Sequence, residues 1–452
     1  MKLAAEIAEK SARAGGRAFL VGGAVRDRLL GFEPKDLDLE IFGVPEDSLT
    51  SLLEEFGSVH LVGRRFAVFH VATPEGTVEV SLPRRETKTG PGHRGFAVEA
   101  DPGMEPRDAS ARRDFTVNAL MEDPLTGEVL DFWEGRRDLE EGVLRHVSSA
   151  FSEDPLRVLR VARFVSRFGW RVHPETAALC RSLDLAELPR ERIEEEWRQI
   201  LVVGEHPGAG VRVMEEVGAL EFFPELDALR GVPQDPEWHP EGDVFVHSCL
   251  ALDAAVAIRE EMEDPWSEML AVLCHDLGKP AATVNQDGRW RSPGHDIGGL
   301  EPTRKFLERI TAQPGVMEKV EALVKEHLRP TQLWQAREDV SDSAIRRLSL
   351  RVDIPTLIRV AWADAAGRGE PMPGPGEWEP ARWLLDRAAA LGVEKEPVRN
   401  FLQGKDLLEF GAEPGPGIGE ILDEAFELQI EGALADRESA LSWARERLGQ
   451  DR

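Results

Sequence analysis

Two aspartates separated by a single residue, Asp36 and Asp38, are the first candidates for chemistry in this sequence. They belong to a run ending at Ile41 in which leucine and isoleucine favour a β-strand. Alternate side chains of a strand project to the same face, so the two carboxylates can share one metal site. Carboxylate oxygens suit hard cations, and Mg²⁺ is the expected ion.

A glycine pair, Gly22 and Gly23, follows the short apolar run from Ala18 to Val21. Adjacent glycines let backbone N–H groups come close to a phosphate, and a following helix start adds partial positive charge. Arg26 is then expected to meet phosphate oxygens. A plain tight turn also explains a glycine pair, but the nearby aspartates favour a nucleotide site.

The run from Val21 to Asp38 resembles the signature of class II tRNA nucleotidyltransferases, the CCA-adding enzymes and their bacterial poly(A) polymerase relatives. Four further motifs of that family follow in its order. They are the ribose-recognition motif (Arg112, Arg113, Asp114, Thr116 and Asn118), the hinge motif (Asp131, Gly135, Asp138 and Leu139), the base-reading motif (Glu153, Asp154, Arg157, Arg160 and Arg163) and the neck motif (Glu191, Arg192 and Glu196). The resemblance implies nucleotide-binding roles for Gly22, Gly23, Arg26, Arg112, Arg113, Asp114, Asn118, Asp154, Arg157, Arg160 and Arg163.

Polymerase-type chemistry uses two metal ions, which activate a 3′-hydroxyl and steady the leaving pyrophosphate. A third acid on a neighbouring strand commonly completes such a site, and Glu79 in the alternating run Val78 to Leu82 is the candidate. A surface strand glutamate is the alternative reading. The basic, glycine-containing segment Arg84 to Arg94 resembles the family's loop near the active site, although a solvated basic loop has the same composition.

Four arginines, Arg157, Arg160, Arg163 and Arg167, are spaced along one face of a helix expected to begin at Pro155. In an acidic chain such a stripe favours contact with phosphates or bases. Asp154 and Arg157 offer one acceptor and one donor fork. Cytosine and adenine both place an amino donor beside a ring-nitrogen acceptor, whereas uracil and guanine present the opposite polarity. The pair can therefore select C and A without a template.

A second group of candidate metal ligands lies downstream: His247, His275, Asp276 and Asp364, with His295 and His327 available for a second ion. A single helical histidine is usually a core or capping residue. Together, however, these imidazoles and carboxylates suit a divalent transition metal such as Ni²⁺, Co²⁺ or Mn²⁺ that activates water. The set resembles the HD phosphohydrolase domain fused to one branch of CCA-adding enzymes, which implies 2′,3′-cyclic phosphodiesterase, 2′-nucleotidase and phosphatase activity.

The chain has 452 residues, 42% of them hydrophobic, and a net charge of −28. This composition indicates a soluble globular protein of several domains, and the acidic balance argues against unspecific attraction to nucleic acid or membrane. Three cysteines give no disulfide framework, and no signal peptide or apolar span is recognisable, so we expect a cytoplasmic protein.

The expected fold is an α/β polymerase-β-like head with a mixed sheet, followed by an all-α neck, an HD domain and a helical tail. The predicted boundaries are 1–142 for the head, 143–205 for the neck, 206–368 for the body with the HD domain, and 369–452 for the linker and tail. The tail, with Gly404, Lys405 and Asp406, resembles the part of some family members that holds the tRNA elbow. The oligomeric state stays open.

The predicted activity is addition of CCA to tRNA 3′ ends from CTP and ATP, with no DNA or membrane partner. Alternatives in the same class are a CC-adding or A-adding enzyme and a poly(A) polymerase. The acidic C-terminus argues against the polymerase, whose relatives tend to carry a basic extension. From another class, the chain could be chiefly an HD phosphohydrolase whose head only docks RNA, which the intact Asp36 and Asp38 argue against.

Overall fold

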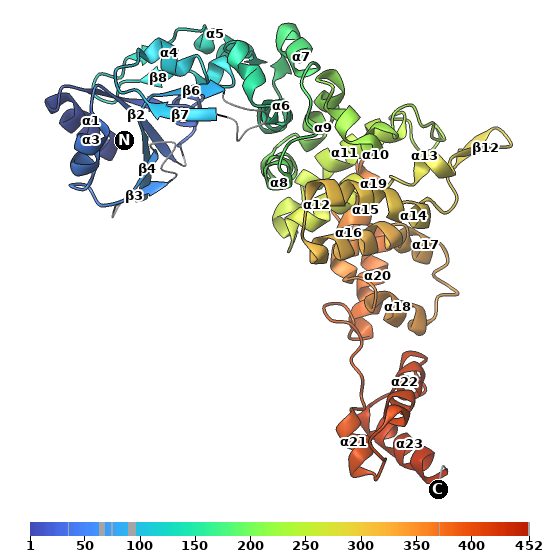
Figure 1. Cartoon of the computed structure of the whole chain (residues 1–452). Helices are drawn as coiled ribbons and strands as arrows, with labels where there is room; N and C mark the ends of the chain where they lie inside the picture. The colour runs from blue at the N-terminus through green and yellow to red at the C-terminus, as the bar shows by residue number, and fades with distance from the viewer. Residues whose placement is uncertain (35, 63–67, 74–75, 89–95, 370, 451–452) are drawn as a thin grey trace. The chain divides into compact units, whose positions relative to one another are not determined.

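The computed structural model describes residues 1–34, 36–62, 68–73, 76–88, 96–369 and 371–450 (Figure 1). The chain divides into two compact units. The first contains Met1–Ile200 and Gly204–Phe222, and the second contains Leu201–Val203 and Phe223–Arg452. The predicted division into four parts is finer than these two units and stays a prediction.

A seven-stranded sheet forms the centre of the first unit, with the strand order β3-β4-β5-β2-β1-β8-β9. The strands are β1 (Arg17–Val21), β2 (Leu37–Phe42), β3 (Ser58–Val62), β4 (Val68–Thr73), β5 (Gly76–Ser81), β8 (Met121–Glu122) and β9 (Val129–Leu130). β2 and β5 run parallel, while the other neighbours are antiparallel. The predicted mixed sheet is therefore confirmed.

Alternation along β2 separates its apolar and acidic side chains. Leu39 and Ile41 are fully buried in a core that also contains residues of α1 (Lys2–Arg13) and α3 (Glu46–Leu53). Because successive side chains of a strand point to opposite faces, Asp38 and Glu40 project away from that core. The sheet thus presents carboxylates on the face that these two helices leave uncovered.

Short helices and a hairpin complete the first unit. The helices are α2 (Gly23–Leu29), α4 (Pro106–Ser110), α5 (Gly135–Glu141), α6 (Leu156–Phe168), α7 (Pro174–Cys180), α8 (Arg190–Arg198) and α9 (Pro207–Glu216), and η1 (Thr116–Asn118) is a 3₁₀ turn. β6 (Arg84–Lys88) pairs with β7 (Phe96–Ala100), and β10 (Val143–Leu144) pairs with β11 (Arg171–Val172). The expected basic loop falls partly outside the described residues, since Gly90, Gly92 and Arg94 are not among them.

The arginine-bearing helix α6 follows Pro155 directly, as predicted, and ends at Gly169, whose φ of 69° suits glycine. Its apolar side chains, such as Leu159 and Val161, are fully buried. α6 packs against α8 and α9. The helix is therefore part of the core of this unit, and its arginines lie on the edges of that core.

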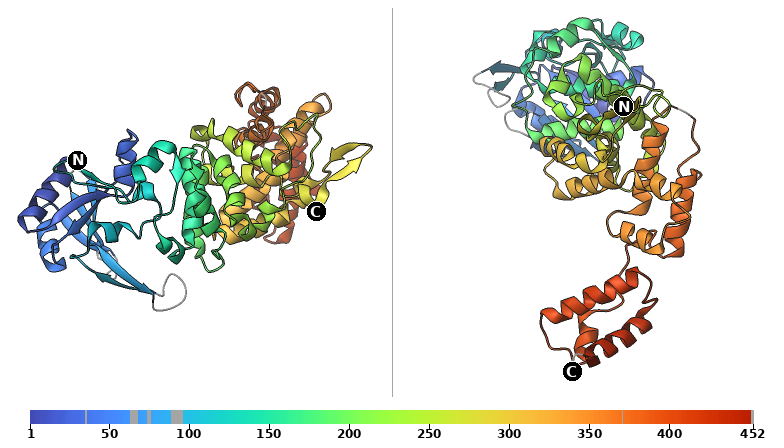
Figure 2. Two further views of the ribbon diagram at one scale, coloured as in Figure 1. Left: turned by 90° about the horizontal axis from the view of Figure 1, so that it is seen from above. Right: turned by 90° about the vertical axis from the view of Figure 1, so that its right-hand side faces the viewer.

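The second unit is almost entirely helical, as Figure 2 shows from two further sides. Its helices are α10 (Pro224–Asp227), α11 (Val244–Val256), α12 (Pro265–Cys274), α13 (Lys279–Ala282), α14 (His295–Gly298), α15 (Leu300–Ile310), α16 (Pro314–Glu326), α17 (Arg329–Gln335), α18 (Asp342–Ser349), α19 (Ile354–Ala366), α20 (Glu379–Ala390), α21 (Gly404–Glu409), α22 (Pro416–Ile430) and α23 (Arg437–Gln450). α11, α12, α16 and α19 pack together, and the last three helices share a small core of their own.

One hairpin interrupts this helical unit and was not predicted. β12 (Val284–Gln286) pairs antiparallel with β13 (Arg289–Arg291). Asp287 and Gly288 form the turn, and both have positive φ, 53° and 83°. An Asp-Gly pair between short strands is a known hairpin signal.

No helix among the described residues is long and apolar enough to cross a membrane.

Candidate active sites

The three candidate catalytic acids of the first unit, Asp36, Asp38 and Glu79, lie where β2 and β5 run side by side. Asp38 on β2 is in register with Glu79 on β5, and Asp36 directly precedes β2. Burial raises the pKa of Asp38 to about 6, and the negative charges of Glu79 and Asp36 add to this although Arg113 opposes it. A bound cation would stabilise the ionised form of Asp38 beside the other two carboxylates.

The glycine turn lies against this acidic group. Gly22 has a φ of 66°, and a Cβ built there would lie 2.9 Å from Arg113 Nη1 and 3.9 Å from Asp38 Oδ2. A side chain would therefore be both strained and crowded at this position. Arg113 in turn lies 3.5 Å from Glu40. The Gly22 turn and Arg113 therefore lie directly beside the acidic group, next to its member Asp38.

Arg26 makes its polar contacts elsewhere. Its side chain is almost fully buried, donates to Asn118 Oδ1 at 2.7 Å and to Asp27 Oδ1 at 2.6 and 2.8 Å, and packs near Phe164 and Phe168. Burial lowers the pKa of Arg26, while Asp27 opposes this. The guanidinium links α2 to η1 and α6, and its predicted contact with phosphate stays a prediction.

The ribose-recognition motif is joined to α6 by one ion pair, that of Asp114 with Arg160. Asp114 accepts hydrogen bonds from Asn118 Nδ2 at 2.9 Å and from Arg160 Nε at 2.8 Å. Burial favours the neutral form of Asp114, but Arg160, Asn118 and the N–H of Phe115 outweigh it and lower the pKa to about 2. Asp114 is therefore a buried carboxylate that stays ionised.

The other arginines of the stripe are also held by acids of this unit. Arg160 and Arg163 lie 3.8 and 3.6 Å from the buried Glu196 of α8, and Arg167 donates to Asp27 at 2.9 Å. The arginine stripe therefore lies between α6 and its neighbours. Burial raises the pKa of Glu196, which the two arginines partly offset.

The two residues predicted to read bases are each fixed from one side. Arg157 donates to the carbonyl oxygens of Ala150 at 2.7 Å and Arg112 at 2.6 Å, and Asp154 accepts from Arg192 at 2.8 and 3.2 Å. Arg112 also donates to the carbonyl oxygen of Arg84. A carboxylate has about four acceptor positions, so Asp154 keeps capacity for a further donor.

The hinge motif lies on α5 and the residues before it, and α5 packs against η1 of the ribose-recognition motif. Asp131 caps α5 by accepting the N–H groups of Gly135 and Arg136 at 2.8 and 3.0 Å. Asp138 accepts from the Thr116 hydroxyl at 2.7 Å, and Leu139 beside it is buried. These contacts hold the ribose-recognition segment against α5.

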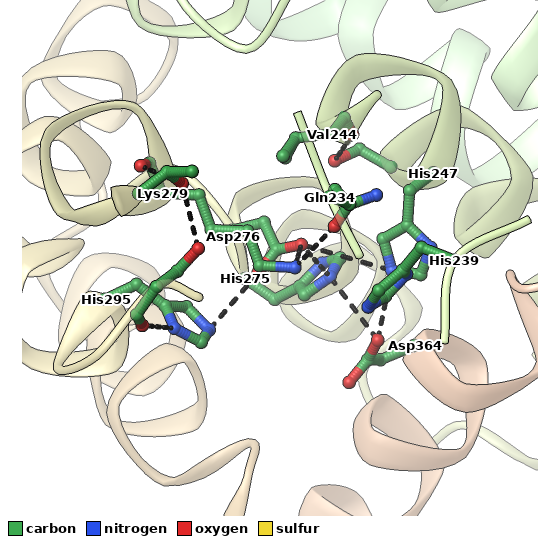
Figure 3. Close-up of polar contacts among 12 residues, drawn as sticks. Gln234, His239, Val244, His247, His275, Asp276, Lys279, His295 and Asp364 are labelled. Atoms are coloured by element: carbon green, nitrogen blue, oxygen red, sulfur yellow. Dashed lines mark hydrogen bonds and ion pairs between the residues drawn. The ribbon is translucent and has the colours of Figure 1, made fainter. Parts of the chain in front are cut away.

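The predicted histidine and aspartate ligands of the second unit come together as two groups (Figure 3). His247, His275 and Asp364, labelled in the figure, offer ligand atoms within 4.8 Å of one another. So do Asp276, His295 and His327. They come from α11, the end of α12, α14, the end of α16, and α19. Both groups are largely buried. The structure therefore brings these six residues close together, and their role as metal ligands stays a prediction.

Three of the imidazoles are fixed in one tautomer. Nδ1 of His275, His295 and His327 lies 2.7, 2.7 and 2.6 Å from the carbonyl oxygens of Val272, Ser292 and Val324. A carbonyl oxygen only accepts, so each Nδ1 carries the proton and each Nε2 faces the cluster. None of these Nε2 atoms has a hydrogen-bond partner among the described residues. Those of His275 and His295 lie 3.1 and 3.3 Å from the Asp276 carboxylate, which is also paired with Lys279 at 2.7 Å. Buried orphan acceptors that converge in this way fit a metal ion.

The sequence analysis did not identify Glu241 or Lys279 as part of this cluster. Glu241 accepts from Nδ1 of His247 at 2.6 Å and of His239 at 2.9 Å, which turns Nε2 of His247 toward Asp364 at 3.0 Å. Hydrogen bonds to Asp364 and Glu241 overcome the effect of burial and raise the pKa of His247 to about 9. Burial lowers the pKa of His327 to about 4. Lys279 lies 2.7 Å from Asp276.

Comparison with known proteins decides the family. Residues 18–145 match the family described as "Poly A polymerase head domain", and residues 169–230 match "Probable RNA and SrmB- binding site of polymerase A". A protein named "Multifunctional CCA protein" from Xanthomonas campestris pv. campestris (strain B100) is 37% identical over 429 residues, which cover 90% of this chain and 97% of the relative. The chain belongs to the CCA-adding enzyme and poly(A) polymerase family.

Further relatives agree with this membership. The "Multifunctional CCA protein" of Pasteurella multocida (strain Pm70) is 37% identical over 369 residues, or 78% of this chain and 84% of the relative. The crystal structure of a Bacillus stearothermophilus CCA-adding enzyme in complex with CTP has a TM-score of 0.66 at 23% identity and covers 100% of this chain and 98% of that one.

The Thermotoga maritima CCA-adding enzyme complexed with tRNA has a TM-score of 0.60 at 19% identity, covering 99% of this chain and 95% of that one. At these identities the two structures show the fold alone. The fold of this family member is therefore the polymerase-β-like head followed by helices, while the roles of its individual site residues stay predictions.

Proposed function

We propose that the chain adds CCA to tRNA 3′ ends from CTP and ATP, without a template. The observation that carries this proposal is the acidic group formed by Asp38, Glu79 and Asp36 beside the Gly22 turn. The relatives named as CCA proteins support the choice of substrate, since 97% of one of them aligns with this chain.

The carboxylates of Asp36 and Asp38, with Glu79 as the third acid, hold Mg²⁺ in this proposal. Bound there, the ions supply activation of the tRNA 3′-hydroxyl and charge neutralisation at the leaving pyrophosphate. The new bond joins the 3′-oxygen to the α-phosphorus of the nucleotide, the bond from that phosphorus to pyrophosphate breaks, and the hydroxyl proton is released to solvent. Arg113 and the Gly22 turn line the space beside these acids and contact the nucleotide.

Base selection falls to Asp154 and Arg157. The carbonyl groups of Ala150 and Arg112 orient the Arg157 guanidinium, and Arg192 orients the Asp154 carboxylate. A fixed donor and a fixed acceptor match the edges of C and A and oppose those of U and G. Arg160 and Asn118 then act mainly by holding α6 and the ribose-recognition segment together, while Arg163 holds α6 against Glu196 of α8.

Products formed on tRNA lacking CCA test this proposal. With CTP and ATP together we expect exactly three added nucleotides, and with CTP alone two. If the product is two nucleotides longer both with CTP alone and with CTP and ATP together, the protein is a CC-adding enzyme. Addition only to tRNA that already ends in CC indicates an A-adding enzyme. Long tails formed with ATP indicate a poly(A) polymerase. Mg²⁺ removal by EDTA should stop every reaction.

A second activity is favoured by the two ligand groups of the second unit. We propose that they bind Ni²⁺, Co²⁺ or Mn²⁺ as an HD phosphohydrolase site, because Nε2 atoms without a hydrogen-bond partner in the described residues lie in compact groups with the carboxylates of Asp276 and Asp364. The metal supplies activation of a water molecule. Water adds to phosphorus, one ester bond breaks, and the leaving ribose oxygen takes a proton.

Hydrolysis of 2′,3′-cyclic AMP and adenosine 2′-phosphate, assayed with each metal, tests this second site. Release of product that depends on the metal and on His275 supports it. Cyclic nucleotide hydrolysis without any CCA addition would favour the other class of protein, an HD phosphohydrolase whose head only docks RNA.

We also propose that α21–α23 contact the tRNA elbow and that the protein works in the cytoplasm.

A further inference from the structure

The histidine cluster opens into a pocket of about 360 Å³ in the second unit. Asp276, His295, His327 and Asp364 line its inner side. Its other lining includes the cations Lys279, Arg291 and Arg368 and two tryptophans, Trp238 and Trp290. The pocket therefore combines metal ligands, positive charge and large aromatic rings, although the chain as a whole is strongly acidic.

The two tryptophans are exposed on the pocket wall. Trp238 is 59% exposed and Trp290 is 37% exposed. Tryptophan is normally well buried, so an exposed indole that lines a pocket is unusual. Two such indoles in a single pocket provide flat surfaces on which a flat ligand can stack.

Hydrogen bonds fix the backbone at each of the two tryptophans. Trp238 lies in a turn in which its N–H donates to the carbonyl of Asp235 at 3.0 Å, and the Asp235 carboxylate accepts the N–H of Glu237 at 3.1 Å. Trp290 lies on β13 opposite Asn285 of β12. Arg289 and Glu237, the residues next to the two tryptophans, form an ion pair at 2.9 Å. The hairpin and the turn are thus joined directly beside the two rings.

Polar contacts connect this wall to the metal ligands. Lys279 Nζ donates to Gln234 Oε1 at 2.8 Å and lies 2.7 Å from Asp276 Oδ2, as Figure 3 shows. Gln234 belongs to the same loop as Trp238. On the opposite side, Arg368 has a buried Nε without a hydrogen-bond partner in the described part of the chain. A phosphate at the cluster would therefore meet cations, while the group attached to it extends toward the indoles.

We propose that Trp238 and Trp290 bind the base of a nucleoside phosphate whose phosphate group lies at the histidine cluster, and so make this site selective for nucleotides. This inference rests on the proposed phosphohydrolase function, which already takes nucleotides as substrates, and adds the two residues that recognise the base. The base stacks on the indoles, and the ribose spans to the metal ligands. The nucleoside phosphate is either a free nucleotide or the last residue of an RNA strand.

Paired substrates that differ in the base test the proposal. Adenosine 2′-phosphate and glycerol 2-phosphate are both phosphate monoesters of a secondary alcohol, but only the first has a base. For each, kcat and KM are measured with Ni²⁺, Co²⁺ or Mn²⁺ on the full chain. The proposal expects the parent to prefer the nucleotide by at least tenfold in kcat/KM, and it expects Trp238→Ala with Trp290→Ala to reduce that preference by about 10- to 100-fold, mainly through KM.

Val284→Ala is the matched control, because Val284 lies on the same hairpin, is 49% exposed and does not line the pocket. Phenylalanine at both tryptophan positions should restore most of the preference, since it also stacks. Circular dichroism checks that each variant is folded. Hydrolysis of an RNA oligonucleotide ending in a 2′,3′-cyclic phosphate is compared with hydrolysis of 2′,3′-cyclic AMP, which separates the two sources of the ligand. Hydrolysis of either substrate that depends on the two tryptophans supports the proposal.

Equal kcat/KM for the two monoesters, or an unchanged preference in the double variant, overturns the inference while leaving the phosphohydrolase function intact. Hydrolysis of no substrate overturns the proposed phosphohydrolase function instead. Calorimetric binding of adenosine 2′-phosphate with Mn²⁺ then decides the inference alone. Affinity that falls at least tenfold in the double alanine variant supports it, and affinity equal to that of the parent contradicts it.

Discussion

Arg160 Nη2 lies 2.6 Å from Asp114 Oδ2 and joins helix α6 to the segment that precedes η1. Asp114 is only 7% exposed, and its second oxygen accepts from Asn118. The pair therefore connects the base-reading motif to the ribose-recognition motif through a buried contact. An arginine that the sequence suggests for nucleotide binding is used here to fix two parts of the site relative to each other.

Arg160→Ala should loosen α6. The variant leaves the buried Asp114 without its strongest partner, and breaking such a pair costs about 2 to 4 kcal/mol. We expect the opening free energy of α6 amides to fall by this amount, measured by hydrogen exchange and mass spectrometry. Arg171→Ala removes an exposed arginine that lies 3.4 Å from Glu141, and it should change stability by less than about 0.5 kcal/mol. Equal protection in both variants contradicts the role of the buried pair.

The same pair gives the first unit a pH dependence of defined sign. The pKa of Asp114 is about 2 in the folded protein, below its usual 3.8. A lowered pKa contributes stability that is fully present above the unfolded value and is lost as the pH falls from about 4 to about 2. Asp114→Asn removes this part. Between pH 5 and pH 3 the parent should lose α6 protection more steeply than the variant, by up to about 1.4 kcal/mol per pH unit. Parallel curves rule this out.

Asp38→Ala should abolish nucleotide addition and leave tRNA binding nearly intact, because the lost carboxylate holds metal in the proposed mechanism. Asp36→Ala should behave in the same way. Single-turnover incorporation of CTP and a filter-binding assay with tRNA measure the two properties. Asp47→Ala, which removes an exposed carboxylate of α3, is the control. An Asp38 variant that keeps more than a tenth of the parent rate shows that the acidic group is not the catalytic centre.

Arg157→Ala should weaken selection against UTP and GTP in addition to slowing CTP use. The lost guanidinium is the fixed donor fork, and a mispaired polar group costs about 1 to 3 kcal/mol, or roughly 10- to 100-fold in discrimination. Arg157→Lys keeps the charge but not the fork, so it should also lose discrimination. Single-nucleotide incorporation with all four triphosphates checks this. Discrimination that stays at the parent level would mean that other groups read the base.

Residue type and strand period were sufficient to predict the acidic group. Alternation along β2 and β5 makes Asp38 and Glu79 project from neighbouring strands, whose pairing the structure shows. The candidate ligands of the second unit were selected because histidine and aspartate are residues that bind transition metals, and their role stays a prediction. Here the sequence identified the members of each group, and the fold brought them together.

What the sequence could not predict is what each helix face contacts. The spacing of Arg160, Arg163 and Arg167 defines one side of α6, but the acids on that side, Asp114, Glu196 and Asp27, come from distant segments. Glu241 was missed for the same reason. Its position two residues before the helix-capping Asp243 gives no sign that it will accept from His247.

The last prediction separates the two proposed active sites. The second-unit ligands use imidazole nitrogens, which suit Ni²⁺, Co²⁺ or Mn²⁺, whereas the acidic group of the first unit offers carboxylates, which suit Mg²⁺. His275→Ala combined with Asp276→Ala should remove hydrolysis of 2′,3′-cyclic AMP with added transition metal and spare CCA addition with Mg²⁺. Asp38→Ala should show the opposite pattern, and Asp423→Ala, which removes an exposed carboxylate of α22, should keep both activities. A double variant that is folded by circular dichroism and yet loses CCA addition would show that the two sites are coupled, because the catalytic carboxylates of the first unit are unchanged in it.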